Sequence, residues 1–320
     1  MSLRHIPIPS TPWAHPPVCP TYNLATRIQT KLQEDLLSWK AAGGTSSSAP
    51  PPRPALMTFT PAPTFTLGRR QPPPTSAERA EMSKRLICET YRPASRADFS
   101  FLKPAIVQTP RGGLTTYHGP GQVLFWPIID LKSPLHNHFT VRSYVSLLEK
   151  TTLETLRKAY NISGFTDPKN PGVWARKSRI VMGPDGDDIE VEGQEEKVAA
   201  LGVHLRRNVT GLGIAINFRM PLSSNPKENP FVRISPCGME SDAVTSVAKL
   251  SGRTLPLEDA VDTLIPMWAD EFARQLGVAN AANRDAGPLV EADTWINWAI
   301  DMGIVKRKNS GFEIARKRKH

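Results

Sequence analysis

The chain has 320 residues and a formal net charge of +10 at pH 7, with 39% hydrophobic and 22% charged residues. This length suits one large domain or two small ones, and the composition is that of a soluble globular protein. No apolar run reaches the roughly 18 residues of a membrane-spanning helix, so we expect no membrane insertion. Three cysteines without a Cys-x-x-Cys pair argue against a disulfide framework and a structural zinc site, and indicate a reducing compartment.

Much of the positive charge lies at the C-terminal end. Residues 306–320 hold seven lysines and arginines against one glutamate, about +6 of the formal charge. Such a tail could attract an acidic partner, but it carries no recognised nucleic-acid-binding motif. We therefore expect a solvated, partly disordered terminus and no nucleic-acid binding.

The first predicted elements lie ahead of a glycine-rich block. Residues 22–39 have apolar side chains at helical spacing without a proline, which predicts a helix. About residues 41–55 are low in complexity and rich in Gly, Ser and Pro, which predicts a flexible insertion. Short strands are predicted at residues 56–59 and 64–67, and a helix over residues 75–89.

The second half of the chain mixes the two periodicities. Apolar runs predict a core strand at residues 123–129 and a pair of strands at residues 172–175 and 179–182. Two further interior strands are predicted at residues 197–203 and 213–218. Helical spacing predicts helices at residues 141–160, 242–250, 257–277 (broken or begun near Pro266) and 295–302. Because no linker separates two cores, we predict a single mixed α/β domain over residues 1–278 and a C-terminal extension over residues 279–320.

Residues 111–122, Arg-Gly-Gly-Leu-Thr-Thr-Tyr-His-Gly-Pro-Gly-Gln, form the most informative segment. A Gly-Gly pair lets the backbone approach a ligand closely, and a core strand follows directly. This arrangement predicts a binding pocket walled by Arg111, Tyr117 and His118. The residues alone also allow His118 to be a satisfied wall residue and Arg111 to be a donor to loop carbonyls.

Cys237 lies between Pro236 and Gly238, at a turn ahead of a predicted helix. A helix N-terminus favours a thiolate, so Cys237 is a candidate nucleophile. A free thiol with a pKa of ~8.5 needs an activating partner to attack near neutral pH. The alternative is a small buried apolar residue.

Lys197 opens an otherwise apolar predicted strand, which places its ammonium group at the strand end, facing a cavity. A lysine beside a thiol lowers the thiol pKa and can shuttle its proton. The alternative is a solvated lysine at the end of a strand. No second His, Cys or carboxylate recurs at ligand spacing near His118, so no metal site is expected.

Taken in order, these motifs resemble those of the lipoyl(octanoyl) transferases. The resemblance covers about residues 4–276 and rests on residues 111–122, on Gly172-Val173-Trp174, on the Lys-Val-Ala-Ala-Leu-Gly run at residues 197–202 and on Pro236-Cys237-Gly238. It implies a biotin/lipoate-ligase-like α/β fold of mixed, α+β type, with a mixed β-sheet flanked by helices.

The resemblance also implies the chemistry. An octanoyl group would pass from octanoyl-acyl-carrier protein to a lysine of lipoyl domains, in 2-oxoacid dehydrogenase E2 subunits or glycine-cleavage H protein, as the first step of endogenous protein lipoylation. Cys237 would be the acyl-thioester nucleophile and Lys197 the residue that lowers its pKa. The implied substrate-binding residues are Arg111, Gly112, Gly113, Leu114, Thr115, Thr116, Tyr117, His118, Ala200, Leu201, Gly202, Gly213, Ile214 and Ala215.

No metal or cofactor is implied, and we expect a monomer. The family role implies mitochondria, although the N-terminal residues show no presequence pattern. Otherwise the cytoplasm is expected.

The chain departs from the family at Leu212, which stands where a histidine is usual. The departure puts a pocket-wall hydrogen bond in doubt. Two alternatives stay open, of which this departure motivates the first. One is a catalytically silent homologue that binds lipoyl-domain proteins. The other is an ATP-dependent lipoate or biotin ligase on the same fold, which would need an adenylate-binding lysine and a phosphate-cradling loop.

Overall fold

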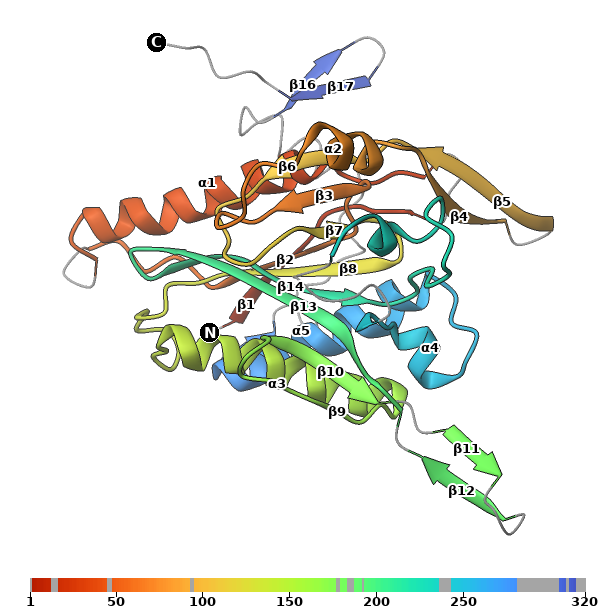
Figure 1. The fold of residues 1–320 in the computed structure, drawn as a ribbon. Coiled ribbons are helices and arrows are strands. Elements are labelled where there is room, and N and C mark those ends of the chain that lie inside the picture. The colour runs from red at the N-terminus through yellow and green to blue at the C-terminus, as the bar shows by residue number, and fades with distance from the viewer. Residues whose placement is uncertain are drawn as a thin grey trace.

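The structure is a computed structural model of the 320-residue chain (Figure 1). It describes residues 2–12, 17–44, 48–92, 95–176, 179–182, 187–191, 193–235, 243–280, 305–308 and 311–314. Cys237 and the helix predicted at residues 295–302 lie outside the described residues. None of the described helices is both long and apolar enough to cross a membrane.

An eight-stranded mixed sheet forms the centre of the fold, in the order β15-β1-β2-β8-β14-β13-β10-β9. β1 runs parallel to β2 and β15, and the other neighbouring pairs are antiparallel. Every residue of β2, β8 and β14 is buried, as expected for strands covered on both faces. The bounds are β1 Ser2–Pro7, β2 Ala55–Phe59, β8 Gln122–Ile128, β9 Gly164–Phe165, β10 Gly172–Arg176, β13 Glu195–Arg206, β14 Val209–Asn217 and β15 Ala279–Asn280.

Helices cover both faces of this sheet (Figure 1). α1 (Tyr22–Ala41) packs on one face, where its apolar side meets Leu124 and Trp126 of β8. α3 (Val141–Tyr160) and α5 (Ile265–Leu276) pack on the other face, against Phe125. Successive side chains of β8 thus enter two different cores, as the two-residue period of a strand requires.

A smaller sheet and three hairpins complete the fold. β3 (Thr64–Leu67) lies between β6 (Ala105–Gln108) and β7 (Thr116–His118) and buries a third apolar cluster around Phe65 and Tyr117. The hairpins β4–β5 and β11–β12 extend away from the central sheet (Figure 1). The remaining bounds are α2 Ser76–Met82, β4 Leu86–Arg92, β5 Ser95–Leu102, β11 Arg179–Met182, β12 Asp188–Val191, the 3-10 turn Pro230–Arg233, α4 Val247–Ser251, the π-helical turn Ala260–Leu264, β16 Val305–Lys308 and β17 Gly311–Ile314.

Several sequence predictions are confirmed. The predicted helix at residues 141–160 coincides with α3, and α1 covers the one predicted at residues 22–39. The long C-terminal helix begins at Ile265, next to Pro266, after a π-helical turn. α1 ends at Ala41 and β2 begins at Ala55, so the low-complexity segment predicted at about residues 41–55 connects these two elements.

The helix predicted at residues 75–89 is wrong in its second half. A capping box between Thr75 and Glu78 starts α2, which ends at Met82. The apolar residues Leu86 and Cys88 then belong to β4, which pairs with β5. A short apolar run fits either a helix or a strand, and here the partner strand decides.

Two further predictions need correction. The strands at residues 172–175 and 179–182 are not paired with each other, because β10 has β13 on one edge and β9 on the other, and β11 pairs with β12. The helix predicted at residues 242–250 shortens to α4, which Ser246 caps by accepting a hydrogen bond from the backbone of Lys249. The basic tail includes a β16–β17 hairpin, which the composition did not predict.

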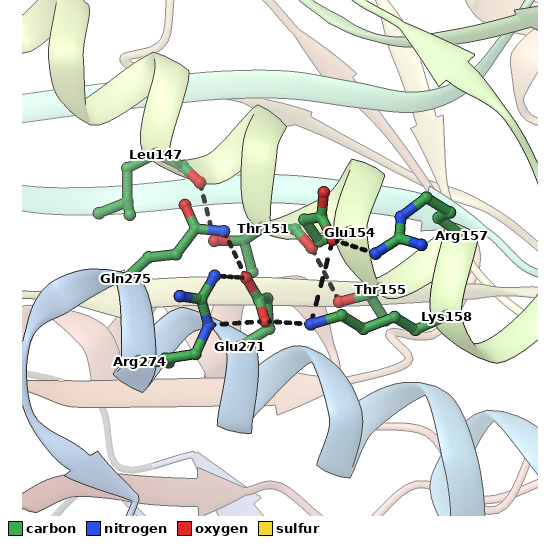
Figure 2. Close-up of polar contacts among 9 residues, drawn as sticks. All are labelled: Leu147, Thr151, Glu154, Thr155, Arg157, Lys158, Glu271, Arg274 and Gln275. Atoms are coloured by element: carbon green, nitrogen blue, oxygen red, sulfur yellow. Dashed lines mark hydrogen bonds and ion pairs between the residues drawn. The ribbon is translucent and has the colours of Figure 1, made fainter.

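A cluster of charged side chains ties α5 to α3 (Figure 2). Glu271 of α5 is only 5% exposed and accepts hydrogen bonds from Lys158 Nζ at 3.0 Å, Arg274 Nε at 3.1 Å and Gln275 Nε2 at 2.7 Å. Together these donors lower the pKa of Glu271 to about 2, and the hydrogen bond from Arg274 makes the largest contribution. The carboxylate therefore favours the folded state at neutral pH.

Replacing Glu271 by glutamine is expected to lower the free energy of unfolding at pH 7 by about 1–2 kcal/mol. The loss is no larger because water screens the charges of its partners Lys158 and Arg274, which are largely exposed. Because folding depresses the pKa, the stabilisation is complete above the ordinary carboxyl pKa of about 4.5 and fades as the pH falls towards 2. Urea unfolding of both proteins from pH 7 to pH 3 measures this. A difference that stays constant over that range would contradict the assignment.

Candidate active site

A narrow cavity lies between α1 and the strands β8, β13 and β14. Its volume is about 30 Å³, and we call it the slot. It brings together nine of the predicted binding residues from three separate segments. The lining residues are Tyr22, Arg111, Thr116, His118, Leu124, Trp126, Ala200, Leu201, Gly202, Leu212, Gly213, Ile214 and Ala215.

Small side chains keep the slot open where β13 and β14 pair. The register places Ala200 opposite Ala215 and Gly202 opposite Gly213. A Cβ on Gly213 would lie 2.1 Å from the carbonyl oxygen of Phe125, whereas one on Gly202 would lie 2.7 Å from Arg111 Cδ. A Cβ at Gly213 would thus collide with backbone, whereas a Cβ at Gly202 would collide with a side chain.

This difference leads to a paired prediction. Gly213→Ala is expected to lower the free energy of unfolding by about 2–3 kcal/mol, since the Phe125 backbone in the middle of the sheet has to move. Gly202→Ala is expected to cost less, about 1–2 kcal/mol, because only the Arg111 side chain has to move, at the expense of its hydrogen bonds to Thr66 O and Leu114 O. Guanidinium unfolding measures both. Equal losses at the two positions would contradict this view of the slot.

The glycine loop divides between the slot and its surroundings. Arg111 is 6% exposed, lines the slot, and donates to Leu114 O at 2.8 Å and to Thr66 O at 2.8 Å. It is therefore both a wall residue and a donor to loop carbonyls. Thr116 and His118 also line the slot. The remaining five predicted loop residues do not; these are Gly112, Gly113, Leu114, Thr115 and Tyr117. Tyr117 instead lines a separate cavity of about 320 Å³.

His118 forms a neutral wall of the slot. Burial, and then the charge of Arg111, lower the pKa of its imidazole to about 3. The ring stacks on Tyr22 with centroids 5.7 Å apart, and its Nδ1 lies 3.2 Å from Gln122 Oε1. Because Gln122 uses its amide nitrogen elsewhere, Nδ1 carries the proton and donates to Oε1.

A chain of hydrogen bonds leads from His118 to Lys197. Gln122 Nε2 donates to Asn217 Oδ1 at 2.7 Å. Asn217 Nδ2 in turn donates to Thr245 O at 3.0 Å and reaches Lys197 O at 3.5 Å. The slot and the backbone of Lys197 are thus held in one buried network.

The Lys197 side chain is 5% exposed, so the alternative of a solvated lysine is wrong. Lys197 lies at the third position of β13, because the strand begins two residues earlier than predicted. Its Nζ donates to Pro171 O at 3.2 Å and lies 4.7 Å from the centre of the Trp174 ring. A buried ammonium over an aromatic face is well placed to exchange a proton or to stabilise an anion.

The segment that carries Cys237 is anchored beside Lys197 at its C-terminal side. Val244 forms a parallel bridge with Lys197, and Thr245 N–H donates to Lys197 O at 3.0 Å. On the other side, Ile234 packs against the apolar cluster that contains Tyr117. Cys237 itself lies outside the described residues.

Leu212 closes the slot on the side of α1. It is 4% exposed, has a φ of +60°, and its N–H donates to Gln29 Oε1 at 2.6 Å. The left-handed conformation costs a side chain such as leucine about 1–2 kcal/mol and suits histidine better. Leucine therefore leaves an apolar wall where the usual family histidine would present ring nitrogens.

The sequence missed three aromatic and apolar walls, Tyr22, Leu124 and Trp126. The two-residue alternation of β8 could have placed Leu124 and Trp126 on one face, but not under α1. In the described part of the chain, no three His, Cys, Asp or Glu side chains gather as a metal site would require.

Comparisons with known proteins agree with this geometry. Residues 28–268 match the family described as lipoyl protein ligase A/B catalytic domain. The fold is similar to a chain of the bipartite lipoate protein ligase system of Thermoplasma acidophilum, with a TM-score of 0.50 at 13% identity over 97% of this chain and 99% of that one. The structure is thus a catalytic domain of the lipoate-ligase class, with the predicted mixed sheet and flanking helices.

Two curated relatives narrow the assignment. A Schizosaccharomyces pombe protein named probable octanoyltransferase is 32% identical over 228 residues, which are 71% of this chain and 80% of the relative. The octanoyltransferase of Cellvibrio japonicus is 34% identical over 56% of this chain and 68% of its own length. The chain belongs to the octanoyltransferase branch of the lipoyl protein ligase A/B family and is an acyltransferase.

Proposed function

We propose that the chain transfers an octanoyl group from octanoyl-acyl-carrier protein to a lysine of lipoyl domains, through a thioester on Cys237. The observation that carries this proposal is the buried network that joins the slot to Lys197, which is itself bonded to the segment following Cys237. The names of the relatives supply the acyl group. E2 subunits and glycine-cleavage H protein are the acceptors that the family role implies.

The first half-reaction is an exchange of thioesters. The Cys237 thiolate attacks the donor carbonyl carbon, a new C–S bond forms, and the bond to the carrier thiol breaks. Lys197 accepts the proton of the Cys237 thiol and delivers it to the departing carrier thiolate. One thioester replaces another, so this step needs no ATP.

The second half-reaction forms the amide. The neutral amine of the acceptor lysine attacks the thioester carbonyl, the C–N bond forms, and the C–S bond to Cys237 breaks. The amine proton passes through Lys197, and the Cys237 thiolate is regenerated beside the ammonium. An amide is more stable than a thioester, which drives the transfer forward.

The slot would bind the acyl chain. Leu124, Leu212 and Ala215 present apolar atoms, and the neutral imidazole of His118 adds no charge. Burial contributes roughly 0.8 kcal/mol per methylene, so seven carbons beyond the carbonyl contribute roughly 5 kcal/mol. Since the slot has a volume of about 30 Å³, its walls would have to move apart for an octanoyl chain to enter.

An ATP-free transfer assay tests the proposal. The protein is incubated with octanoyl-acyl-carrier protein and an apo lipoyl domain, and the domain is weighed by mass spectrometry. Octanoylation of its lysine without nucleotide is expected. Modification only with ATP and free octanoate would instead identify a ligase.

Leu212 gives one reason to consider a second candidate, a silent homologue that only binds lipoyl domains. Saturable binding of the apo domain without any acylation would identify it.

We also propose a mitochondrial location, because an octanoyltransferase of Saccharomyces cerevisiae named as mitochondrial is 32% identical over 61% of this chain and 53% of its own length. Cell fractionation tests that proposal.

A further inference from the structure

One peptide group links Lys197 to a buried carboxylate on the opposite side. The carbonyl of Pro171 accepts a hydrogen bond from Lys197 Nζ at 3.2 Å, and the N–H of the next residue, Gly172, donates to Glu149 Oε1 at 2.9 Å. The ammonium and the carboxylate thus hold the two ends of the same peptide unit. Glu149 comes from α3 and is 9% exposed.

The loop that carries this peptide is fixed on every side. Gly172 has a φ of +133°, and a Cβ there would lie 2.4 Å from Ala199 O, so no other residue fits. Asp167 accepts from the backbone of Lys169 at 2.9 Å, and Trp174 Nε1 donates to Asn170 O at 3.0 Å. The Pro171 carbonyl is therefore held in a fixed position where it accepts the hydrogen bond of the Lys197 ammonium.

A carboxylate at this depth has an electrostatic effect as well. Burial raises the pKa of Glu149, whereas the Gly172 hydrogen bond and the charge of Lys197 lower it. The reciprocal effect is that the carboxylate favours the charged form of Lys197. Asp167 also feels the charge of Lys197, which is the smallest of the causes that lower its pKa, but its carboxylate is bound mainly within its own turn. Glu195 and Glu196 pair with Arg176 and Lys249.

We propose that Glu149 is a positioning residue for Lys197, which holds the Pro171–Gly172 peptide in place and keeps the ammonium charged. This inference rests on the proposed function of Lys197 as the partner of Cys237. Glu149 does not line the slot, and acts through the peptide and through its charge.

The test compares Glu149→Gln and Glu149→Ala with Glu271→Gln. Glutamine keeps an oxygen that accepts from Gly172 but removes the charge, and alanine removes both. Glu271→Gln removes an equally buried carboxylate between α3 and α5, among Lys158, Arg274 and Gln275, and so reports the effect of lost stability alone (Figure 2). The readouts are the pH profile of kcat/KM for octanoyl transfer and the pH dependence of iodoacetamide alkylation at Cys237.

For Glu149→Gln we expect both limbs of the transfer profile, and the alkylation midpoint, to move to lower pH by about one unit, since a negative charge facing the pair is gone. For Glu149→Ala we expect a further loss of about tenfold in kcat. Glu271→Gln should leave the profile in place. The alkylation signal is specific, because burial raises the pKa of both Cys19 and Cys88 to about 12.

Profiles of Glu149→Gln that superimpose on the parent, or an equal shift in Glu271→Gln, would overturn the inference. The proposed function fails separately, if the parent protein transfers no octanoyl group or if Lys197→Met leaves both readouts unchanged. The alkylation measurement needs no donor, so it decides the role of Glu149 even when transfer fails. If Glu149→Ala does not fold, the Gln variant alone decides.

Discussion

Lys197→Met is expected to lower kcat/KM for octanoyl transfer by about 10²–10⁴-fold, the usual contribution of a positioned proton-transfer group. Methionine keeps an apolar stem over the Trp174 ring but cannot donate to Pro171 O or stabilise a thiolate. Stability should change by less than about 1 kcal/mol, since an expensive buried charge is removed together with its hydrogen bond. Single-turnover transfer and thermal unfolding measure the two effects.

Lys249→Met is the matched control. Lys249 lies on α4, is 43% exposed and pairs with Glu196 at the start of β13. Transfer by this variant should stay within about twofold of the parent, because exposed ion pairs contribute little. Activity of Lys197→Met within threefold of the parent would remove Lys197 from the chemistry.

Trp268→Ala is expected to have the largest effect on stability, a loss of about 3–5 kcal/mol. Trp268 of α5 is fully buried, stacks on Phe272 with centroids 5.2 Å apart, and lies 4.4 Å from the Phe125 ring. Its Nε1 donates to Thr152 Oγ1 of α3 at 2.9 Å. The substitution therefore opens a cavity where both helices meet the sheet and leaves the buried Thr152 hydroxyl without its donor.

Urea unfolding followed by circular dichroism measures this loss. Trp39→Ala is the control, since Trp39 lies half-buried near the end of α1 and its ring N–H donates to Ala49 O. It should cost less than about 1.5 kcal/mol. Equal losses of unfolding free energy in the two variants would contradict the view that Trp268 lies at the centre of the main core.

Local patterns predicted the long elements and placed part of the glycine-rich loop at a cavity. The apolar spacing of residues 141–160 is strong enough to define α3 completely. Arg111 and His118 marked one wall of the slot, whereas the Gly-Gly pair between them lies outside its lining. The pairing of β13 with β14 supplied the small residues of another wall. These features depend on contacts within one segment or on motifs read in order.

Features that depend on distant partners could not be predicted. Glu149 reads as one more polar residue on α3 until the loop before β10 places Gly172 against it. The left-handed backbone of Leu212 depends on Gln29 of α1, far away in the sequence. The surroundings of Lys197 likewise depend on Trp174 and Pro171, which its local strand pattern does not reveal.

The most direct test of the central claim is the intact mass of the protein after incubation with octanoyl-acyl-carrier protein and no acceptor. One octanoyl group should appear on the parent protein, should map to the peptide that contains Cys237, and should be released by hydroxylamine as a thioester. Cys237→Ala should carry no such mass, while the half-buried Cys19 and the buried Cys88 remain unmodified. An unmodified parent protein, or an equal adduct on Cys237→Ala, would contradict the thioester mechanism.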